Sequence, residues 1–382
     1  MYASANRPHT PADASRRLLG APASRIDTPA LVIDLDAMER NIAAMSAFAR
    51  LHGMRLRPHA KSHKSEAIAR LQLAAGAVGV CVQKTAEAEA LAAAGVHDIY
   101  ISNQVIDPAK LARVAQLAQR VRLGIAVDST VGIDRLAAAL HGTSGSVDVL
   151  VEIDVGQGRC GVPPEAAGLL ARHVVDRGLR FAGLQAYHGG AQHLRSVTER
   201  QDAIGGAISG VAVAKDMLAM QGLHCPLVTG GGTGTFALEA ASDVYDELQC
   251  GSYIFMDRDY AQNNAIHGAP QFEHALFVKS SVVSRGVSHA VLDAGHKSHA
   301  IDSGMPGVWQ RDLVVSNGGD EHAIVRAGGS DALPELGETV WLVPGHCDPT
   351  VNLHDNFIGV RGGLDDGVVE AVWPVDARGC IS

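Results

Sequence analysis

The feature that most constrains this fold is a recurring alternation of short apolar runs with alanine-rich stretches of helical period. Most runs, such as VGVCV and VDVLVEI, are apolar throughout rather than alternating in polarity, which is typical of strands covered on both faces. Strands that alternate with helices form βαβ units and a parallel sheet. The runs occupy residues 29–35, 56–60, 78–82, 98–102, 123–127, 147–153, 181–187, 226–230 and 247–253.

The number of runs indicates the architecture. Without the first run, eight strands remain between Leu56 and Tyr253, which is the number in a (β/α)8 barrel. A doubly wound open sheet is the alternative, but its glycine-rich turn normally comes early in the chain. The glycine-rich turn here is late, at residues 230–234. We therefore predict an α/β fold with a TIM-type (β/α)8 barrel.

The predicted secondary-structure pattern changes after residue 262. Strand-like runs such as HALFVKSSVVS, HAVLDAG, TVWLVPGHCD and GVVEAVWPV follow one another, joined by Gly, Asn and Asp turns and without a long helical stretch between them. Clusters of these turn residues between short strands are typical of all-β structure. We therefore predict a separate C-terminal β domain.

Composition excludes some functions and suggests a compartment. The formal net charge of −9 argues against a general nucleic-acid-binding protein, and no apolar run approaches the roughly 20 residues that a membrane-spanning helix needs. Residues 1–24 are rich in Ser, Ala and Arg, like a transit peptide, but a disordered or packing arm is the preferred interpretation. The six cysteines show no CxxC spacing, which is typical of reduced thiols, so we expect a cytoplasmic enzyme.

Polar residues end most of the predicted barrel strands. The carboxyl ends of barrel strands build the active site, so these side chains are expected to face one cavity. The set combines an amine, a cation, hydrogen-bonding groups and a glycine-rich turn, which indicates an enzyme rather than a smooth binding surface. Its members are His59, Lys61, Gln83, Asn103, Asp128, Asp154 with Arg159, Tyr187, His188, the glycines at 230–232, and Tyr253.

Two of these segments suggest pyridoxal 5′-phosphate (PLP). The stretch RPHAKSHKS is either a solvated basic loop or the frame of a reactive lysine, since a desolvated Lys61 can attack an aldehyde. The stretch VTGGGTGTF is either a flexible turn or a phosphate cradle of backbone N–H groups with the Thr233 hydroxyl. It lacks the GK[ST] of a nucleotide P-loop and the spacing of a dinucleotide fingerprint. Together, a lysine and a phosphate cradle predict PLP bound as a Schiff base.

The segment LVPGHCDPTVNLHD could bind a metal. If residues 343–348 end a strand, His346 and Asp348 share a face and Cys347 points away. An imidazole and a carboxylate at this spacing can bind a divalent cation completed by water, whereas the alternative is a polar turn. His354 and Asp355 follow and either support the site or play no part in it.

His193, in the segment YHGGAQH, follows a predicted barrel strand. Most of the 18 histidines are expected to be structural. A histidine on a loop at the barrel mouth is a better candidate for a general base than most.

Seven segments together resemble one enzyme family. They are TPALVIDLDAMERNI, RPHAKSHKS, VEIDVGQGRCGV, LQAYHG, TGGGTGT, ELQCGSYIFMDRDY and PGHCDPTVNLHD. As a set they are similar to the D-threonine aldolases and the D-3-hydroxyaspartate aldolases, alanine-racemase-like PLP enzymes with an N-terminal barrel and a C-terminal β domain. The resemblance implies an arm and first strand joining the β domain (1–36), a PLP-binding barrel (37–261) and a β domain carrying a metal site (262–382).

The resemblance also implies roles for single residues. Lys61 would be the Schiff-base lysine, and Arg159 would face the pyridine nitrogen of PLP. His193 would remove the proton of the substrate's β-hydroxyl group. The phosphate would be held by Gly232, Thr233, Gly251 and Tyr253, the ring lined by Gln83 and Tyr187, and Mn²⁺ (or Mg²⁺, Co²⁺ or Zn²⁺) bound by His346 and Asp348.

The implied reaction is retro-aldol cleavage of a D-β-hydroxy-α-amino acid to glycine and an aldehyde. D-Serine and D-3-hydroxyaspartate dehydratases share the architecture, but their metal pair reads His-x-Cys with zinc, whereas Asp348 suits a harder ion. Alanine racemase needs no metal pair. A PLP-carrier protein, the non-enzymatic alternative, lacks the C-terminal β domain. A sugar-phosphate-binding barrel would keep the glycines without requiring Lys61.

The substrate stays open between D-threonine and D-3-hydroxyaspartate. The second needs a cation for its extra carboxylate, and the candidates are Arg195, Arg258 and Lys297. A homodimer is expected by analogy with the family.

Overall fold

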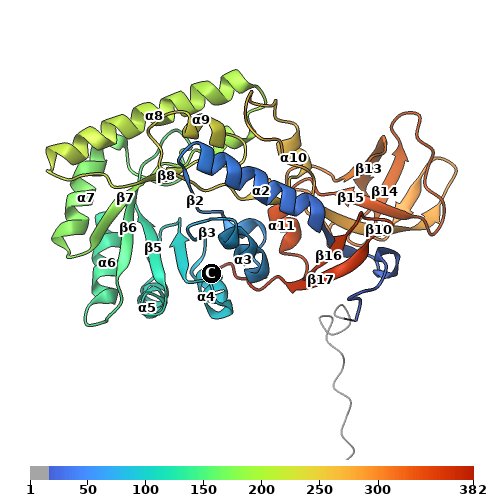
Figure 1. Ribbon diagram of the computed structural model, residues 1–382, viewed down its shortest axis with the longest axis horizontal. Coiled ribbons are helices and arrows are strands. Elements are labelled where there is room, and N and C mark those ends of the chain that lie inside the picture. The colour runs from blue at the N-terminus through green and yellow to red at the C-terminus, as the bar shows by residue number, and fades with distance from the viewer. Residues whose placement is uncertain (1–16) are drawn as a thin grey trace, which may run out of the picture. The chain divides into compact units, whose positions relative to one another are not determined.

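The computed structural model describes residues 17–382, which form two compact units (Figure 1). The barrel unit comprises Asn41–Ile254, Asp259–Phe272 and Gly379–Ser382. The β unit comprises the chain up to Arg40, Phe255–Arg258 and Glu273–Arg378. The boundaries predicted after residues 36 and 261 stay predictions, and the chain passes between the two units after Arg40 and after Arg258, among other points. Most of the predicted N-terminal arm, residues 1–16, lies outside the described residues.

The barrel unit is built on a parallel sheet of eight strands in the order β2-β9-β8-β7-β6-β5-β4-β3. A parallel bridge between His59 and Cys81 joins the two ends of this order, and the Cys81 N–H donates to the Pro58 carbonyl at 2.8 Å. The predicted (β/α)8 barrel is therefore confirmed. Its strands are β2 (Arg55–Leu56), β3 (Val80–Val82), β4 (Asp98–Ile101), β5 (Arg122–Val127), β6 (Val147–Glu152), β7 (Arg180–Gln185), β8 (Val228–Gly230) and β9 (Glu247–Leu248).

The barrel strands are buried on both faces because helices cover the outside of the sheet (Figure 1). Polar caps fix where several helices begin. The Asp107 side chain accepts from the Lys110 N–H, and the Ser129 side chain accepts from the Gly132 N–H. Each cap satisfies one backbone N–H group that has no partner within its helix. The helices are α3 (Glu66–Ala74), α4 (Thr85–Ala94), α5 (Pro108–Leu117), α6 (Thr130–Leu140), α7 (Ala167–Asp176), α8 (Val197–Met220), α9 (Phe236–Ala240) and α10 (Arg258–Ala261).

Helix α8 is long and apolar enough to cross a membrane, with a window of mean hydropathy 1.4. The sequence prediction considered only uninterrupted apolar runs, and glycines and charged residues interrupt the apolar positions of α8. Its buried residues Ile204, Ala207, Val211, Ala214 and Leu218 recur every three or four positions, so one face packs into the barrel core. That packing places α8 among the helices that cover the barrel, with 28% of its apolar window buried.

The β unit contains a sheet of nine strands. The main order is β13-β14-β11-β10-β1-β16-β17, and β15 pairs with β10 and β12. Strand β1 lies between β10, to which it is antiparallel, and β16, to which it is parallel, so the first apolar run belongs to this sheet. The strands are β1 (Ala30–Asp34), β10 (Leu276–Arg285), β11 (Ala290–Leu292), β12 (Gly307–Val308), β13 (Leu313–Asn317), β14 (Ala323–Ala327), β15 (Thr339–Val343), β16 (Asn356–Arg361) and β17 (Val368–Pro374).

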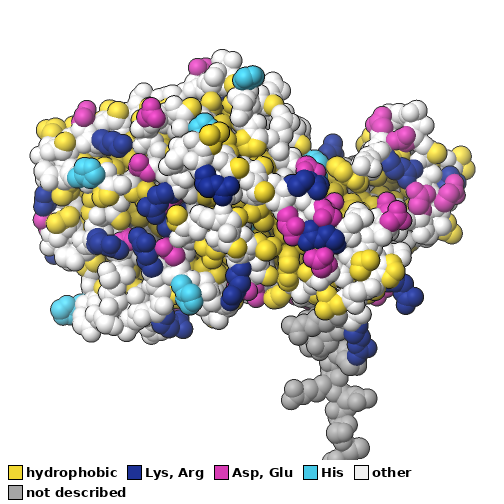
Figure 2. All heavy atoms as spheres, in the orientation of Figure 1, with side chains coloured by type: hydrophobic (Ala, Val, Ile, Leu, Met, Phe, Trp, Pro, Cys, Tyr) yellow, Lys and Arg dark blue, Asp and Glu magenta, His cyan; other side chains and the backbone are white. Residues whose placement is uncertain are grey.

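Two helices complete the β unit: α2 (Leu35–Leu51) begins in it, and α11 (Cys347–Val351) follows β15. Exposed ion pairs attach the start of α2 to the sheet, since Arg361 binds Asp36, Glu39 and Glu370 at 2.7–3.0 Å. Figure 2 shows such acidic and basic side chains side by side on the surface of this unit. Exposed pairs of this kind each contribute only about 0–1 kcal/mol.

Candidate active site

Polar side chains meet at the carboxyl ends of β2, β3 and β4. The Nε2 atom of His59 lies 3.1 Å from Nε2 of Gln83 and 3.2 Å from Oγ of Ser102. The Asn103 side chain donates to the Gln83 carbonyl at 3.0 Å. The ends of three strands are thereby tied together by His59, Gln83 and Asn103, which were predicted to face one cavity, and by Ser102, which was not.

The basic stretch after β2 is mostly buried, so the solvated-loop interpretation is wrong. Arg57, His59, His63 and Lys64 are each 7% exposed or less. A 3-10 turn over Ala60–Ser62 places Lys61 directly after the strand end, half-buried, with its N–H donating to Nδ1 of His59 at 3.4 Å. The fold therefore presents Lys61 at the barrel's carboxyl end.

The second lysine of this stretch, Lys64, has a different environment. It adopts a left-handed backbone with φ of 52° and forms an ion pair with Glu87 at 3.0 Å. The Glu87 carboxylate also accepts the N–H groups of Gln83 and Lys84 at 2.9 and 3.0 Å. Lys64 thus neutralises a carboxylate that fixes the start of α4, which leaves Lys61 as the candidate nucleophile.

The glycine-rich turn after β8 is shaped for close contact. Residues 231–236 are buried, and Gly231 adopts φ of +72°, which favours glycine. A Cβ atom on Gly232 would lie 2.5 Å from Oε1 of Gln192, and one on Gly234 would lie 2.5 Å from the Gln192 carbonyl oxygen. Any larger residue at these two positions would collide with its neighbours.

This turn fits a phosphate group. Within residues 17–382, the backbone N–H groups of Gly232 and Thr233 donate no hydrogen bond, although both residues are buried. Buried N–H groups nearly always have a partner, and successive donors in a turn form an anion-binding concavity. The turn therefore fits the phosphate of PLP by the chemistry of its donors.

A second loop, after β9, packs against this cradle. The Tyr253 N–H donates to Oγ1 of Thr233 at 3.0 Å, and a Cβ atom on Gly251 would lie 3.0 Å from the His59 carbonyl oxygen. The Tyr253 hydroxyl accepts from Nε2 of Gln72 at 3.1 Å in the core, where burial raises its pKa. Tyr253 is thus connected to the cradle through its backbone, while its phenol faces helix α3.

Arg159 lies on a shaped loop after β6. The Asp154 carboxylate accepts the N–H groups of Gly156 and Gly158, both at 3.0 Å, and these bonds lower its pKa. The Arg159 side chain is exposed on this loop. Tyr187, predicted to line the cofactor ring, is half-buried beyond β7.

Sequence reasoning missed Gln192, which organises the cradle. It lies in the 3-10 turn Gly190–His193, where its Oε1 accepts the Gly234 N–H at 2.9 Å and its Nε2 donates to Oγ1 of Thr235 at 2.8 Å. Its position immediately before His193 was the available signal. The turn thereby supports the cradle with one residue and positions the candidate base with the next.

Sequence reasoning also missed the partner of His193. Nδ1 of His193 is hydrogen-bonded to Oδ2 of Asp259, whose other oxygen accepts from Arg195. Asp259 lies in the segment FMDRDY, whose acidic residues had no predicted role. Asp259 is separated from His193 by 66 positions, and no pattern in the sequence pairs them.

The proposed metal pair lies where β15 gives way to α11. The strand ends at Val343 and His346 is the N-cap of α11, so the expectation of a strand through residue 348 is wrong. Pro349 is the reason, since proline is tolerated in the first turn of a helix but cannot donate to a strand ladder. Cys347 is buried, and its N–H donates to Asp257 at 3.1 Å.

The donors at this position are one imidazole and one carboxylate. Nδ1 of His346 lies 2.6 Å from Oδ2 of Asp302, so Nε2 is the nitrogen that a metal could bind. Among residues 17–382, no group of three or more His, Cys, Asp or Glu side chains is arranged to hold a metal. A metal bound by His346 and Asp348 alone would take its other ligands from water or substrate. His354 contacts the Ser298 carbonyl at 2.8 Å, and Asp355 is paired with Arg378.

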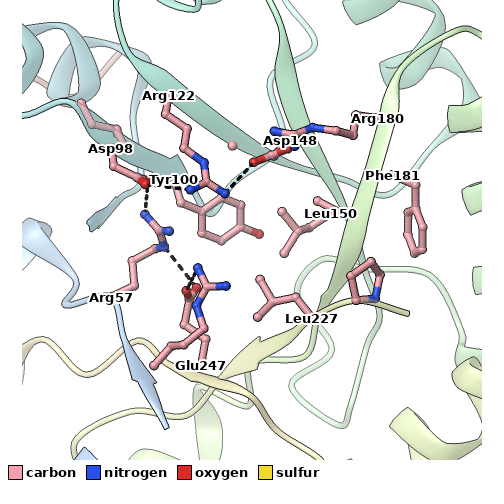
Figure 3. A pocket seen from close by; sticks show the side chains of 15 residues that line it. Arg57, Asp98, Tyr100, Arg122, Asp148, Leu150, Arg180, Phe181, Leu227 and Glu247 are labelled. Carbon is pink, nitrogen blue, oxygen red and sulfur yellow. Dashed lines mark hydrogen bonds and ion pairs between the residues drawn. The ribbon is translucent and has the colours of Figure 1, made fainter. Parts of the chain in front are cut away.

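One cavity of the barrel lies at the other end of the strands (Figure 3). This cavity of about 290 Å³ is lined by the first residues of β4, β5, β7 and β9. Every charged side chain there has a partner of opposite sign, and the pairs follow one another around the barrel in the order Arg55, Glu247, Arg57, Asp98, Arg122, Asp148, Arg180. Residues at this end of a barrel usually serve stability.

Beside the cradle, Glu239 on α9 is fully buried and accepts from the Thr235 hydroxyl at 2.7 Å. Burial raises the pKa of Glu239 from 4.5 to about 7, despite that hydrogen bond. Because folding raises the pKa of Glu239, its contribution to the free energy of unfolding is fully present below about pH 4.5 and is lost as the pH rises through about 7.

We expect Glu239→Gln to raise the free energy of unfolding at pH 8 by up to about 3 kcal/mol and to change it little at pH 4.5. The glutamine is isosteric and can still accept from Thr235. Thermal unfolding at both pH values measures this, with the exposed Glu321→Gln as control. An equal effect at both pH values would contradict the assignment.

Comparisons with known proteins support the fold and name the family. The alanine racemase N-terminal domain model matches residues 33–259, and a serine dehydratase domain model matches residues 275–360. The chain is 46% identical to a D-threonine aldolase of Arthrobacter sp. over 94% of this chain and 95% of that protein. It is 44% identical to a 3-hydroxy-D-aspartate aldolase of Paracoccus denitrificans, over 95% of each.

Solved structures agree. The crystal structure of D-threonine aldolase from Filomicrobium marinum matches with a TM-score of 0.93 and 49% identity, covering 95% of this chain and 99% of that one. D-threo-3-hydroxyaspartate dehydratase from Delftia sp. HT23 matches with a TM-score of 0.82 and 29% identity, covering 92% and 98%. The chain therefore belongs to the family of D-threonine and 3-hydroxy-D-aspartate aldolases, PLP-dependent aldehyde-lyases with the alanine-racemase fold.

Proposed function

We propose that this enzyme cleaves D-threonine to glycine and acetaldehyde, using PLP and a divalent metal ion, with Mn²⁺ as the preferred ion. The observation that carries the proposal is the pairing of a half-buried Lys61 with a buried cradle of unpartnered Gly232 and Thr233 N–H groups in one barrel. A lysine amine and an anion site are the two attachments that PLP requires.

Each of the chain's own groups has a defined task in this proposal. Lys61 would hold the cofactor's aldehyde carbon, and the cradle would hold its phosphate. Gln83 and Tyr187 would line the ring, and the Arg159 guanidinium would face its nitrogen. Nε2 of His193 accepts the proton of the substrate's β-hydroxyl group as the Cα–Cβ bond breaks. PLP, when bound, supplies the electron sink for that bond.

His346 and Asp348 are the groups proposed to bind the metal. A divalent ion bound there would polarise the β-hydroxyl and lower its pKa. An imidazole with a carboxylate suits Mn²⁺ or Mg²⁺ better than a thiolate pair does. The Cys347 thiol is buried, which raises its pKa well above its usual value, and its sulfur donates to the Met256 carbonyl at 3.3 Å.

The choice of D-threonine over D-3-hydroxyaspartate follows from the candidate cations. Arg195 binds the Asp259 carbonyl and the Asn263 side chain, both at 2.7 Å. Arg258 donates to the Met305 carbonyl at 3.1 Å, and Lys297 is paired with Glu321 at 2.7 Å. Because each is engaged within the chain, none is ready to receive a second substrate carboxylate.

We expect metal-stripped enzyme to release glycine from D-threonine only after Mn²⁺ is added, and faster than from D-3-hydroxyaspartate. His346→Ala and Asp348→Ala should also lose Mn²⁺ binding in calorimetry, whereas His296→Ala, at an exposed ion pair with Asp320, should not. Glycine release without metal would contradict the metal assignment, and preference for D-3-hydroxyaspartate would contradict the substrate.

A dehydratase is the second candidate function, favoured by the serine dehydratase domain match over residues 275–360. Ammonia release from D-serine, in the absence of glycine release from D-threonine, would establish it. The expected homodimer and cytoplasmic location stay predictions from the sequence.

A further inference from the structure

We propose that Asp259 and Arg195 are positioning residues that fix the tautomer and the orientation of His193, so that its Nε2 atom is the proton acceptor. The inference rests on the proposed role of His193 as the base. It deepens that role by naming the groups that make one histidine out of 18 competent for it.

The geometry defines a chain of contacts that ends at the imidazole. His193 closes the 3-10 turn Gly190–His193, and its Nδ1 is hydrogen-bonded to Oδ2 of Asp259 on helix α10. Oδ1 of Asp259 accepts from Arg195, whose guanidinium also donates to the Asn263 side chain at 2.7 Å. Asn263 in turn donates to the Gln192 carbonyl at 2.8 Å, which closes the network on the residue before His193.

The two side chains of this contact differ in exposure. The Asp259 side chain is 11% exposed, whereas the His193 side chain is 49% exposed, so the imidazole stays accessible while its Nδ1 contacts the carboxylate. The ring of Tyr260 packs against the imidazole with centroids 5.5 Å apart and restricts its tilt.

Charge determines where the proton sits. Burial would raise the pKa of Asp259, but hydrogen bonds from Arg195 and His193 outweigh it and lower that pKa. Asp259 is therefore an ionised acceptor at neutral pH and cannot donate to the ring. Nδ1 must then carry a hydrogen, which leaves the lone pair of the neutral imidazole on Nε2.

The chain contains a matched control for this arrangement. On the outer helices α6 and α7, Asp134 contacts Nε2 of His173 at 2.7 Å and Nε of Arg177 at 2.6 Å. The residue types are the same, but the group lies outside the strand ends that carry the candidate site. Asp134→Asn therefore repeats the chemical change of Asp259→Asn without touching His193.

The experiment compares Asp259→Asn, Asp134→Asn, His193→Ala and the double variant Asp259→Asn/His193→Ala as PLP- and Mn²⁺-loaded enzymes. We expect Asp259→Asn to lower kcat for D-threonine cleavage by on the order of 10-fold to 100-fold with little change in KM. Asp134→Asn should leave kcat unchanged. In the His193→Ala background, Asp259→Asn should cause no further loss, because it acts through the imidazole.

A spectroscopic measurement separates positioning from general damage. The ¹⁵N signals of His193, assigned by their absence in His193→Ala, should report hydrogen on Nδ1 in the parent enzyme at a pH where the ring is neutral. In Asp259→Asn they should report a mixture of tautomers or the other one, because the asparagine amide can donate to Nδ1. Arg195→Met should give a smaller effect of the same kind, since Asp259 remains but loses its anchor.

Three results would overturn the inference, and they are distinguishable. If His193→Ala cleaves D-threonine at the parent rate, the base assignment fails and the inference fails with it. If His193→Ala is impaired but Asp259→Asn is not, only the positioning role fails. If the two losses multiply in the double variant, or the tautomer does not change, Asp259 acts on something other than His193.

Discussion

Replacement of Lys61 by alanine will abolish D-threonine cleavage while the protein stays folded. Lys61 is itself only half-buried, so its truncation removes less packing than loss of a buried side chain would, but it is the amine proposed to hold the cofactor's aldehyde carbon. Without it, PLP keeps only its phosphate contacts and is bound weakly and in no fixed orientation. Activity assays measure the loss of cleavage, circular dichroism measures whether the protein stays folded, and the visible absorbance of bound PLP measures the weaker binding of the cofactor.

Lys64 is the matched control because it lies in the same basic stretch. Lys64→Arg keeps the charge that pairs with Glu87 and should retain cleavage activity and bound PLP. Borohydride reduction of the loaded enzyme, followed by peptide mass spectrometry, should place the pyridoxyl group on Lys61. Cleavage at the parent rate by Lys61→Ala, or label on Lys64, would contradict the assignment.

Glu247→Ala is expected to produce the largest loss of stability, about 3–5 kcal/mol in the free energy of unfolding. Glu247 is 1% exposed and its carboxylate binds both Arg57 and Arg55 at 3.1 Å (Figure 3). Arg57 is itself 7% exposed and would keep only Asp98 as a partner. A buried guanidinium that loses a carboxylate cannot regain that solvation from water.

The double variant Arg57→Met/Glu247→Leu tests the reason for this loss. Removing both charges should destabilise less than the sum of the two single variants, because no buried charge is left partly paired. Arg40→Met, at an exposed pair with Glu273, should cost less than about 1 kcal/mol. Urea unfolding measures the free energy of unfolding of the double variant, of Arg57→Met, of Glu247→Leu and of Arg40→Met. Additive losses would show that the arginine and the glutamate act independently.

Much of the architecture could be predicted from local pattern. Each barrel strand is a continuous apolar run, and all eight were expected within a few residues of where they lie. Strands β12, β13, β14 and β16 were missed, because they are short or alternate weakly with polar residues. Such strands are specified by pairing with neighbours, as β13 with β14, rather than by their own hydrophobicity.

The candidate site was predictable where one segment carries the chemistry. The late glycine-rich turn indicated an anion cradle, and the structure adds buried N–H donors and close approach to Gln192. The metal pair was predicted on the premise that residues 343–348 end a strand, whereas helix α11 begins at Cys347 and has Pro349 in its first turn.

The sequence by itself determined the barrel, the cradle and the set of polar residues at the strand ends, because these depend on periodicity and on the backbone freedom of glycine. Only the tertiary structure decided that Lys64 is committed to Glu87, and that Asp259, 66 residues away, holds His193. These outcomes depend on which side chains the closed sheet brings within hydrogen-bonding distance. Long-range pairing of this kind leaves no periodic trace in the residues that take part.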